Sequence, residues 1–423
     1  MTGRPWLGCV ADDYTGGTDV AAGLRRSGLS TALLFGVPGP STAIPDCAAL
    51  VVALKTRTAP AAEAVAQSVA SVRRLADAGA QRFYVKYCST FDSTAEGNIG
   101  PVVDAVLDEL GEDQTLLCPA SPEHGRSVFH GHLFVGDRLL SESSMRTHPL
   151  TPMTDSDLRR VLASQTPHPV GLLGHDALAA GPDAARRTLA DLRGSGVRHV
   201  VADAVDEADL EVLGAAAQGL RVVTGGAGLA RALAGTRRAG SAESRPARSV
   251  VPTGLPSGPS VIVAGSCSAA TLDQVARARA EFPSYRVTPA TSDDPEEIWR
   301  GIRAWLNGHV GGGPALVYAS ATTEERAATQ RVFGEKTVEI LEGLLARAAD
   351  HAVALGARRV VVAGGETSGA VVQALGITSV VVGEEADRGV PWCLTSGPDP
   401  IRLLLKSGNF GAPDLLVRAV NTP

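Results

Sequence analysis

The chain has 423 residues, a formal net charge of -6 at pH 7 and 44% hydrophobic residues. This length exceeds what one hydrophobic core usually covers, so we expect two domains. Acidic and basic residues are interspersed, which argues against a surface for nucleic acid or for an anionic membrane. The sequence shows no signal peptide and no apolar run long enough to span a bilayer, so we expect a cytoplasmic protein without membrane or nucleic-acid partners.

In the first half of the chain, short apolar runs alternate with segments of helical period, which is the pattern of βαβ units and a parallel sheet. The expected strands are 6–11, 31–35, 49–54, 82–87, 114–118, 198–203 and 220–224. The expected helices are 18–28, 60–78, 97–110, 154–164, 182–194 and 206–217. One segment, 127–140, interrupts the alternation and is predicted to form a hairpin insertion that turns at Gly136-Asp137.

Residues 235–259 are rich in Gly, Arg, Ser and Pro, and this composition predicts a domain boundary. We expect an N-terminal domain over 1–240, a linker over 241–258 and a C-terminal domain over 259–423. The later strands are expected at 260–265, 315–319, 358–363, 378–382 and 392–395, and the later helices at 269–281, 295–306 and 324–354. The predicted fold class is α/β: two α/β domains with mainly parallel sheets and an active site in the cleft between them.

An acidic loop follows the first expected strand. Asp12, Asp13 and Asp19 surround a turn that also carries Thr15 and Gly16. This is the strand end at which open α/β sheets bind ligands. Carboxylates there would repel bare phosphate, so they suit a hydroxyl to be deprotonated, a polyol to be bound or a magnesium ion to be held.

Polar clusters follow three more strands of the N-terminal domain, and a parallel sheet would set them beside the acidic loop. They contribute Lys55, Arg57, Lys86, Ser89, Thr90, Asp92, Glu123 and Arg126. Together these groups suit a small, hydroxylated, anionic molecule whose carboxylate an arginine could bind in a fork. Each cluster alone could instead be a set of helix caps and loop salt bridges. We expect His148 to line a loop that touches the substrate, and the nearby histidines lack the spacing of a metal site.

Glycine-rich loops of the C-terminal domain predict a nucleotide site. Gly364–Gly369 lies between an expected strand and a helix, so its amides could bind phosphate. It lacks the lysine of a P-loop, which disfavours a P-loop NTPase. Residues 261–268 enter a helix in the same way, and 406–411 form another glycine-rich turn.

In this order and spacing, the motifs resemble those of the four-carbon acid sugar kinases, over nearly the whole chain. The matching motifs are Ala11–Gly16, Cys88–Thr94, Gly131–Asp137, His148–Met153, Gly265–Ser268, Gly364–Gly369 and Ser407–Gly411. The resemblance implies a sugar-binding N-terminal domain, a nucleotide-binding C-terminal domain and ATP-dependent phosphorylation of the C4 hydroxyl of a four-carbon acid sugar. The expected substrate is 3-oxo-tetronate, with erythronate, threonate or 3-oxo-isoapionate as alternatives. The alternative from another class is a regulator that binds a sugar acid or a nucleotide without turnover.

The resemblance also implies site residues, with ATP and Mg²⁺ as cofactors. Those expected at ATP are Ser266, Ser268, Gly364, Gly365, Glu366, Thr367, Ser368 and Gly408, and Glu366 would reach Mg²⁺ through water. The catalytic candidates are Asp13, Asp12 and Lys86, with Asp13 preferred as the proton acceptor. The substrate-binding candidates are Asp12, Thr15, Gly16, Asp19, Lys55, Arg57, Ser89, Thr90, Asp92, Glu123, Arg126 and His148. A homo-oligomer is compatible with the sequence.

Overall fold

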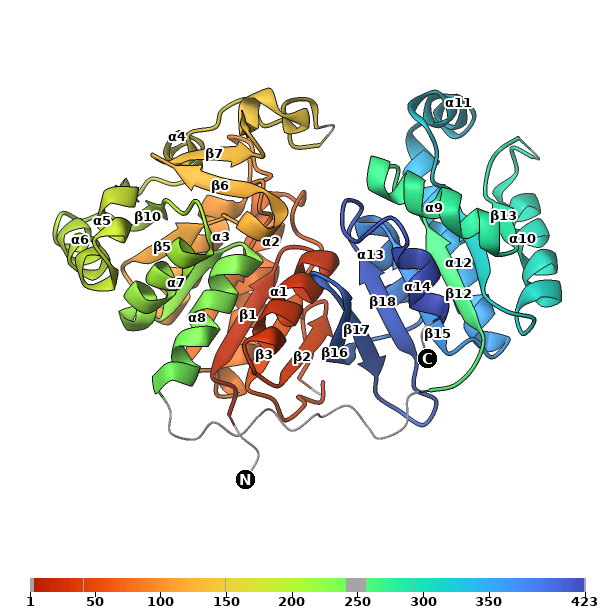
Figure 1. Ribbon diagram of the computed structural model, residues 1–423, viewed down its shortest axis with the longest axis horizontal. Coiled ribbons are helices and arrows are strands. Elements are labelled where there is room, and N and C mark those ends of the chain that lie inside the picture. Colours follow the sequence, from red (N-terminus) through yellow and green to blue (C-terminus); the bar gives the residue numbers. More distant parts are fainter. Residues whose placement is uncertain (1–3, 41, 149, 241–255, 291, 422–423) are drawn as a thin grey trace. The chain divides into compact units, whose positions relative to one another are not determined.

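The computed structural model describes residues 4–40, 42–148, 150–240, 256–290 and 292–421, so most of the expected linker lies outside the described residues. The chain divides into two compact units, Met1–Ser249 and Val250–Pro423. Each unit is an α/β fold built on its own run of hydrogen-bonded strands (Figure 1).

The sheet of the first unit is parallel, and its strands are mainly apolar and buried, except for the half-buried edge strand Val170–Leu173, as expected where helices cover both faces. In sheet order the strands are β2 (Thr31–Phe35), β3 (Ala49–Ala53), β1 (Leu7–Ala11), β4 (Arg82–Lys86), β11 (Val222–Gly225), β5 (Thr115–Cys118), β10 (His199–Ala202) and β9 (Val170–Leu173). The helices are α1 (Tyr14–Arg26), α2 (Ala61–Asp77), α3 (Ile99–Leu110), α4 (Leu158–Ala163), α5 (His175–Ala179), α6 (Pro182–Gly194), α7 (Glu207–Ala216) and α8 (Ala227–Gly240). Helices α1, α7 and α8 pack together over one face, and α2 packs with α3 (Figure 1).

The expected hairpin insertion is a small antiparallel sheet of β6 (Arg126–Phe129), β7 (His132–Val135) and β8 (Arg138–Leu139). The chain turns at Gly136-Asp137 as predicted, but it also turns earlier, at His130-Gly131. Both residues of this earlier turn have positive φ, 50° and 74°. The Asp203 carboxylate accepts hydrogen bonds from both of their backbone amides, at 2.9 and 2.8 Å, and so stabilises a histidine in the left-handed region. The predicted turn is thus confirmed, and the earlier turn was not predicted because it depends on Asp203, which is distant in sequence.

Within the described residues, the second unit has five parallel strands in a row. Two more strands extend this row, and each pairs antiparallel with the strand before it. In sheet order they are β13 (Ser284–Arg286), β14 (Ala315–Tyr318), β12 (Ser260–Ala264), β15 (Arg359–Ala363), β18 (Arg402–Lys406), β17 (Val390–Thr395) and β16 (Ser379–Asp387). The helices are α9 (Ala269–Glu281), α10 (Pro295–His309), α11 (Thr323–Phe333), α12 (Thr337–Ala354), α13 (Gly365–Ala374) and α14 (Leu415–Asn421). Short 3₁₀ turns complete the two units at η1 (Pro122–His124), η2 (Leu140–Glu142), η3 (Ser144–Thr147), η4 (Ala217–Gly219) and η5 (Gly334–Lys336).

Three expected helices differ from the observed ones. The helix expected over 154–164 begins only at Leu158, because the Asp157 side chain caps α4. The helix expected over 324–354 is broken at Gly334, whose φ of 61° is left-handed, so that α11 and α12 are separate. The first helix begins at Tyr14 rather than at residue 18, because the Asp13 side chain caps it. Thr15, Gly16 and Asp19 therefore lie on α1 and not in an exposed loop.

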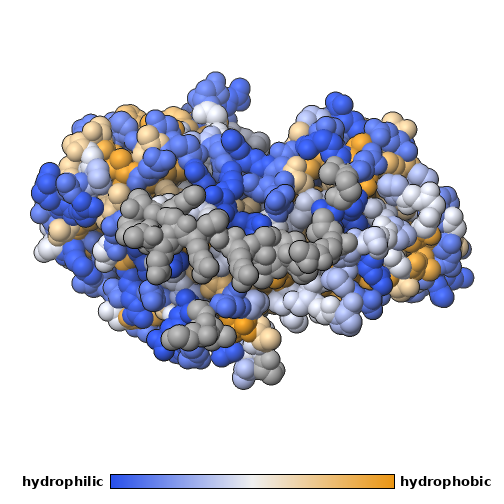
Figure 2. Space-filling view, turned by 60° about the horizontal axis from the view of Figure 1, so that its bottom comes forward, coloured by the Kyte–Doolittle hydropathy of each residue, from blue (hydrophilic) through white to orange (hydrophobic). Residues whose placement is uncertain are grey.

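Hydrophilic residues cover most of the face shown in Figure 2, with apolar ones in small groups. The exposed large hydrophobic side chains of the described residues are Val37, Phe129, Leu150, Val205, Val332, Val338 and Leu355. In the part of the chain that the structure describes, every helix is too short or too polar to cross a membrane.

Candidate active site and nucleotide loops

Strand β1 delivers two adjacent carboxylates to the carboxyl edge of the first sheet. Asp13 is the N-cap of α1: its Oδ1 accepts the Gly16 N–H at 2.9 Å and its Oδ2 accepts the Thr15 hydroxyl at 2.8 Å. These bonds fix the Asp13 carboxylate against the positive end of the helix. Asp12 takes no part in the cap, and its carboxylate points toward the loop after β3.

Arg57, in the loop that follows β3, binds both carboxylates. Its Nε and Nη2 donate to Asp12 at 2.9 Å each, and Nη2 also donates to Asp13 Oδ1 at 2.7 Å. The Arg57 side chain is 24% exposed, and those of Asp12 and Asp13 are 16% and 20% exposed. Such a planar, two-pronged contact between largely buried groups fixes the orientation of the Asp12 carboxylate.

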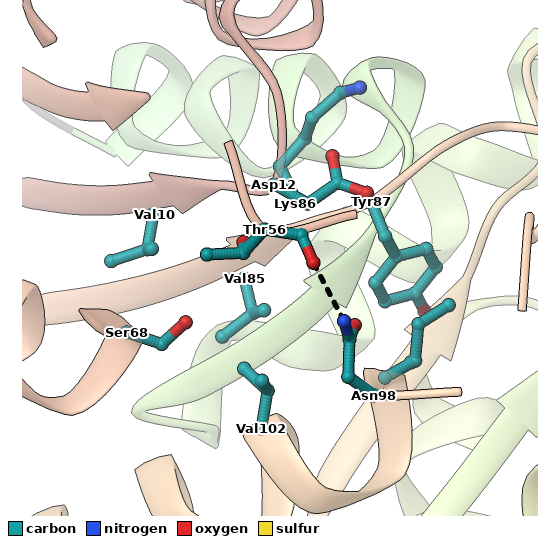
Figure 3. A pocket seen from close by; sticks show the side chains of 10 residues that line it. Val10, Asp12, Thr56, Ser68, Val85, Lys86, Tyr87, Asn98 and Val102 are labelled. Carbon is teal, nitrogen blue, oxygen red and sulfur yellow. Dashed lines mark hydrogen bonds between the residues drawn. The ribbon is translucent and has the colours of Figure 1, made fainter. Parts of the chain in front are cut away.

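Asn98 holds the Arg57 loop in place and was not identified from the sequence. Its Nδ2 donates to the Thr56 carbonyl at 2.7 Å (Figure 3) and also to the Ala59 carbonyl at 3.0 Å. Asn98 precedes α3 without capping it through its side chain, and it is only 7% exposed. An asparagine at the start of a predicted helix could have suggested a structural role. Its hydrogen-bond partners could not be predicted, because they lie some forty residues earlier in the chain.

Lys86, the last residue of β4, brings a buried ammonium to the same edge. It pairs in register with Ala11 of β1 and is 4% exposed. A Cβ atom added at Gly16 would lie 2.4 Å from Lys86 Nζ and 2.1 Å from Asp13 Oδ1, so only glycine leaves room for both groups. In Figure 3 the Lys86 ammonium and the Asp12 carboxylate point away from the apolar side chains of Val10, Val85 and Val102.

The charges of this cluster shift one another's pKa values. Burial raises the pKa of Asp12, and the adjacent Asp13 charge adds to this effect, although Arg57 opposes it. Burial also acts upward on Asp13, but Arg57, Lys86 and the bonds from Thr15 and Gly16 together hold its pKa below the usual value. Burial acts downward on Lys86, yet Asp13 and Asp12 raise its pKa above that of an ordinary lysine. Two carboxylates with opposite shifts are typical of sites that divide the work of acid and base.

Asp19 lies further along α1 and is 8% exposed. Its Oδ1 is buried and has no hydrogen-bond partner among the described residues. Burial raises its pKa to about 7, against the opposing effect of Lys86. Glu123 also raises the Asp19 pKa, and both Glu123 oxygens accept hydrogen bonds from Arg26 at 3.0 and 3.1 Å. Asp19 is therefore a buried carboxyl whose pKa Lys86 and Glu123 influence in opposite directions, and the fork from Arg26 occupies Glu123.

The other substrate candidates have different surroundings. Lys55 is exposed, with its Nζ 5.9 Å from the centre of the Tyr14 ring. Ser89 is half-buried, and the buried Thr90 hydroxyl donates to Asp92 at 2.5 Å. Arg126 and His148 form hydrogen bonds within their own loops. Arg126 donates to the His124 carbonyl, and His148 Nδ1 accepts the Thr151 amide and hydroxyl. The direct contacts thus join Asp12, Asp13, Thr15, Gly16 and Arg57, with Lys86 against Gly16, and they do not extend to Lys55, Arg126 or His148 among the described residues.

In the second unit, the loops that follow β12, β15 and β18 converge. The Gly364 N–H donates to the Lys406 carbonyl at 2.8 Å, and the Ser266 N–H donates to the Ala363 carbonyl at 3.2 Å. The Ser268 hydroxyl, which caps α9, donates to the Gly408 carbonyl at 2.5 Å. These bonds bring the three glycine-rich loops, predicted separately from the sequence, into one cluster.

Helix α13 starts within this cluster and has no side-chain cap. Its N-cap residue is Gly364, with a φ of 133° that favours glycine. The Ser368 hydroxyl donates back to the Gly364 carbonyl at 2.6 Å, Thr367 is buried and Glu366 is exposed. Uncapped amides at a helix start, approached by a glycine backbone, form a binding place for phosphate. No group of three His, Cys, Asp or Glu side chains in the described residues could hold a metal ion.

The two halves of the chain match two different family models. Residues 7–233 match the family model of a sugar-binding N-terminal domain, and residues 261–416 match that of a nucleotide-binding C-terminal domain. A protein of Burkholderia multivorans named 3-oxo-tetronate kinase is 49% identical over 99% of this chain and 97% of its own length. A protein of Haemophilus influenzae with the same name is 40% identical over 96% of this chain and 97% of its own.

Two solved structures share the fold over nearly the full length. A crystal structure from Salmonella typhimurium LT2 has a TM-score of 0.86 at 40% identity and covers 98% of both chains. One from Haemophilus influenzae has a TM-score of 0.79 at 38% identity and covers 98% of this chain and 100% of its own. The family models and the similar proteins together identify a kinase of small molecules. The chain belongs to the four-carbon acid sugar kinase family.

Proposed function

We propose that this enzyme transfers the γ-phosphoryl group of ATP to the C4 hydroxyl of 3-oxo-tetronate. The relatives of that name, similar over almost the whole chain, support the choice of substrate. We further propose that residues 1–240 bind the acid sugar and residues 259–423 bind ATP, as the two family models suggest. The observation that carries the proposal is the pair of aspartates held by Arg57 beside the Lys86 ammonium.

Asp12 suits the role of proton acceptor better than Asp13. Both Asp13 oxygens already accept hydrogen bonds from the start of α1, and its pKa is lowered, which makes it a weak base. Asp12 accepts side-chain hydrogen bonds from Arg57 alone among the described residues, and burial raises its pKa. A base with a raised pKa accepts a proton more readily near neutral pH. We therefore place Asp12 at the C4 hydroxyl and regard Asp13 as the residue that orients Arg57 and α1.

In the proposed reaction, the C4 oxygen forms a bond to the γ-phosphorus while the bond from that phosphorus to the bridging oxygen breaks and ADP leaves. The hydroxyl proton passes to Asp12. Such transfers depend on positioning and on neutralising the charge of the phosphoryl group. Lys86 is the cation placed beside the carboxylates to stabilise this charge, and the amides at the start of α13 bind the phosphates of ATP.

Mg²⁺ fits this arrangement as an ion carried by ATP. Magnesium commonly uses one or two protein carboxylates together with the phosphates of the substrate. Glu366, which is exposed on the first turn of α13, would supply such a ligand through water. The ion would neutralise phosphate charge during transfer.

The decisive experiment measures ADP release with ATP, Mg²⁺ and each of four acids: 3-oxo-tetronate, erythronate, threonate and 3-oxo-isoapionate. We expect the highest kcat/KM with 3-oxo-tetronate. Asp12→Asn should lower kcat by about 10³-fold or more while ADP binding is unchanged, because the proton acceptor is lost. Asp77→Asn is the matched control, because Asp77 is 69% exposed and forms a long, solvent-accessible ion pair of 3.6 Å with Arg74. Release of ADP that depends on none of the acids, or an Asp12→Asn enzyme with full kcat, would contradict the proposal.

A further inference from the structure

Lys406, the last residue of β18, is a fully buried lysine that the proposed reaction does not yet use. Its exposed fraction is 0%. Its Nζ donates to the Thr271 hydroxyl and to the Gly408 carbonyl, both at 2.8 Å. Both partners are uncharged, and Lys406 forms no ion pair with any described residue. A buried cation without a counter-ion is unfavourable, so this site is electrostatically incomplete.

The surroundings of Lys406 consist of the nucleotide loops. Its own carbonyl accepts the Gly364 N–H, and Gly408 and Thr271 connect its ammonium to the turn after β18 and to the first turn of α9. The positive ends of α9 and α13 are therefore both nearby, and they add to the cost of a further positive charge. The group that would remove this cost is an anion at the loops.

The protein itself supplies no such anion among the described residues. The acidic groups on the elements around Lys406 are Cys267 on the loop after β12, Asp273 and Glu281 on α9, Glu366 on α13, Cys393 on β17 and Asp387 at the end of β16. The cationic ones are Arg402 on β18, Arg359 on β15, and Arg277 and Arg279 on α9. Asp273 is exposed and pairs with Arg277, Asp387 pairs with Arg418, and Glu366 is exposed. None of them affects the pKa of Lys406, which burial alone lowers to about 7.

We propose that Lys406 is the buried counter-charge of the bound nucleotide and takes up one proton from solvent when nucleotide phosphates occupy the loops. This inference rests on the proposed nucleotide site of the second unit. The proton passes from water or buffer to the lone pair of Nζ, and no covalent bond between heavy atoms breaks. Lys406 acts here as a positioning residue, because its hydrogen bonds also hold the Gly408 turn against α9.

Proton linkage gives this proposal a quantitative signature. Below pH 7 the free protein already carries the charge, so nucleotide binding is strongest there. Above pH 7 binding must first protonate the lysine, so the association constant falls with rising pH until the pKa of the complex is reached. For a free pKa of about 7 and a complex pKa near the ordinary lysine value of 10.5, we expect a loss of about fivefold from pH 7 to 8 and about ninefold more from pH 8 to 9.

Calorimetric titration with ADP at pH 8, in Tris and in HEPES, measures the proton uptake directly. The two buffers have different ionisation enthalpies, and the phosphates of ADP, with a second pKa of about 6 to 7, are already ionised at that pH. The wild-type protein should take up about 0.9 proton per ADP. Lys406→Arg keeps a permanent charge, so it should bind ADP without proton uptake and with little change between pH 7 and 9. Lys336→Met, which alters an exposed lysine of the same unit, should behave as the wild type.

The outcomes separate this inference from the proposed function. Tight ADP binding by the wild type without proton uptake at pH 8 would overturn the role of Lys406 and leave the nucleotide site intact. Uptake that persists in Lys406→Arg would do the same, since another group would then be titrating. Failure of the wild type to bind ADP at any pH would overturn the nucleotide site, and this inference with it.

Discussion

Lys86 and Lys406 end parallel strands in the two units of the chain, and both are buried, yet their surroundings are electrostatically opposite. Lys86 lies beside Asp13 and Asp12, which raise its pKa and keep it charged. Lys406 has only neutral partners, and burial lowers its pKa to about 7. The charge of Lys86 is balanced without a ligand, whereas the charge of Lys406 needs an anion to balance it. We infer that, under the proposed function, the first unit is preorganised for catalysis and the second unit gains its missing counter-charge when nucleotide binds.

Replacing Lys86 tests the preorganised half of this comparison and should have the largest effect. In Lys86→Met the methionine removes the ammonium beside Asp13 and Asp12, so transition-state charge is less well neutralised. We expect kcat/KM for the acid sugar to fall by about 10³-fold, with the affinity for ADP unchanged. Steady-state kinetics with ADP titration of the same preparation would measure both quantities.

The corresponding Lys406→Met variant provides the contrast. Its loss should fall on the ATP side, as a KM increase of about tenfold near pH 7, with kcat changed much less. If Lys86→Met instead weakened ADP binding, or Lys406→Met lowered kcat as much as Lys86→Met, the two lysines would not have the separate roles assigned to them.

Substituting Gly16 or Gly408 by alanine should lower activity by an intermediate amount, and it compares how much room the acidic site and the nucleotide loops leave for a Cβ atom. A Cβ in Gly16→Ala would lie within 2.4 Å of Lys86 Nζ and would also displace the capping carboxylate of Asp13, so two charged groups must move. We expect kcat to fall by about 10²-fold. In Gly408→Ala the nearest atom is the Ser266 hydroxyl oxygen at 2.5 Å, the end of a small side chain that can rotate. This variant should mainly raise KM for ATP, and an effect on kcat equal to that of Gly16→Ala would argue against a preorganised acidic site.

The sequence predicts the acidic site better than its supports. The continuous apolar runs of the sequence predict the bounds of β1 to β5 to within one or two residues, because these strands are buried and end at polar residues. Strand β9 is missed, since its four residues contain Gly171 and are mostly half-buried. Helix α8 is missed because it follows two glycines, and the antiparallel pairing of β17 cannot be read from periodicity.

Within the sites, proximity in sequence decides what can be foreseen. Asp12, Asp13, Thr15 and Gly16 share one motif, so their joint location follows from the strand end. The fork from Arg57 and the support from Asn98 depend on contacts across about 40 residues of chain. The neutral environment of Lys406 is likewise formed by α9, more than a hundred residues earlier, and no local pattern predicts it.

The pH dependence of stability should show the smallest effect and sharpens the comparison furthest. Lys406 has a folded pKa below its unfolded value of about 10.5, so the unfolded chain binds more protons between pH 7 and that value. Its contribution to stability therefore rises with pH across this window. Lys86 has a raised pKa, so its contribution is present at neutral pH and is lost only as pH rises through the folded pKa.

Without nucleotide, the wild type should gain about 2 °C in Tm per pH unit relative to Lys406→Met between pH 7 and 9. Thermal melts of both proteins, with Lys336→Met as a control, would measure this difference; parallel pH profiles for wild type and Lys406→Met would mean that Lys406 is charged in the free protein, and that it needs no anion to become so.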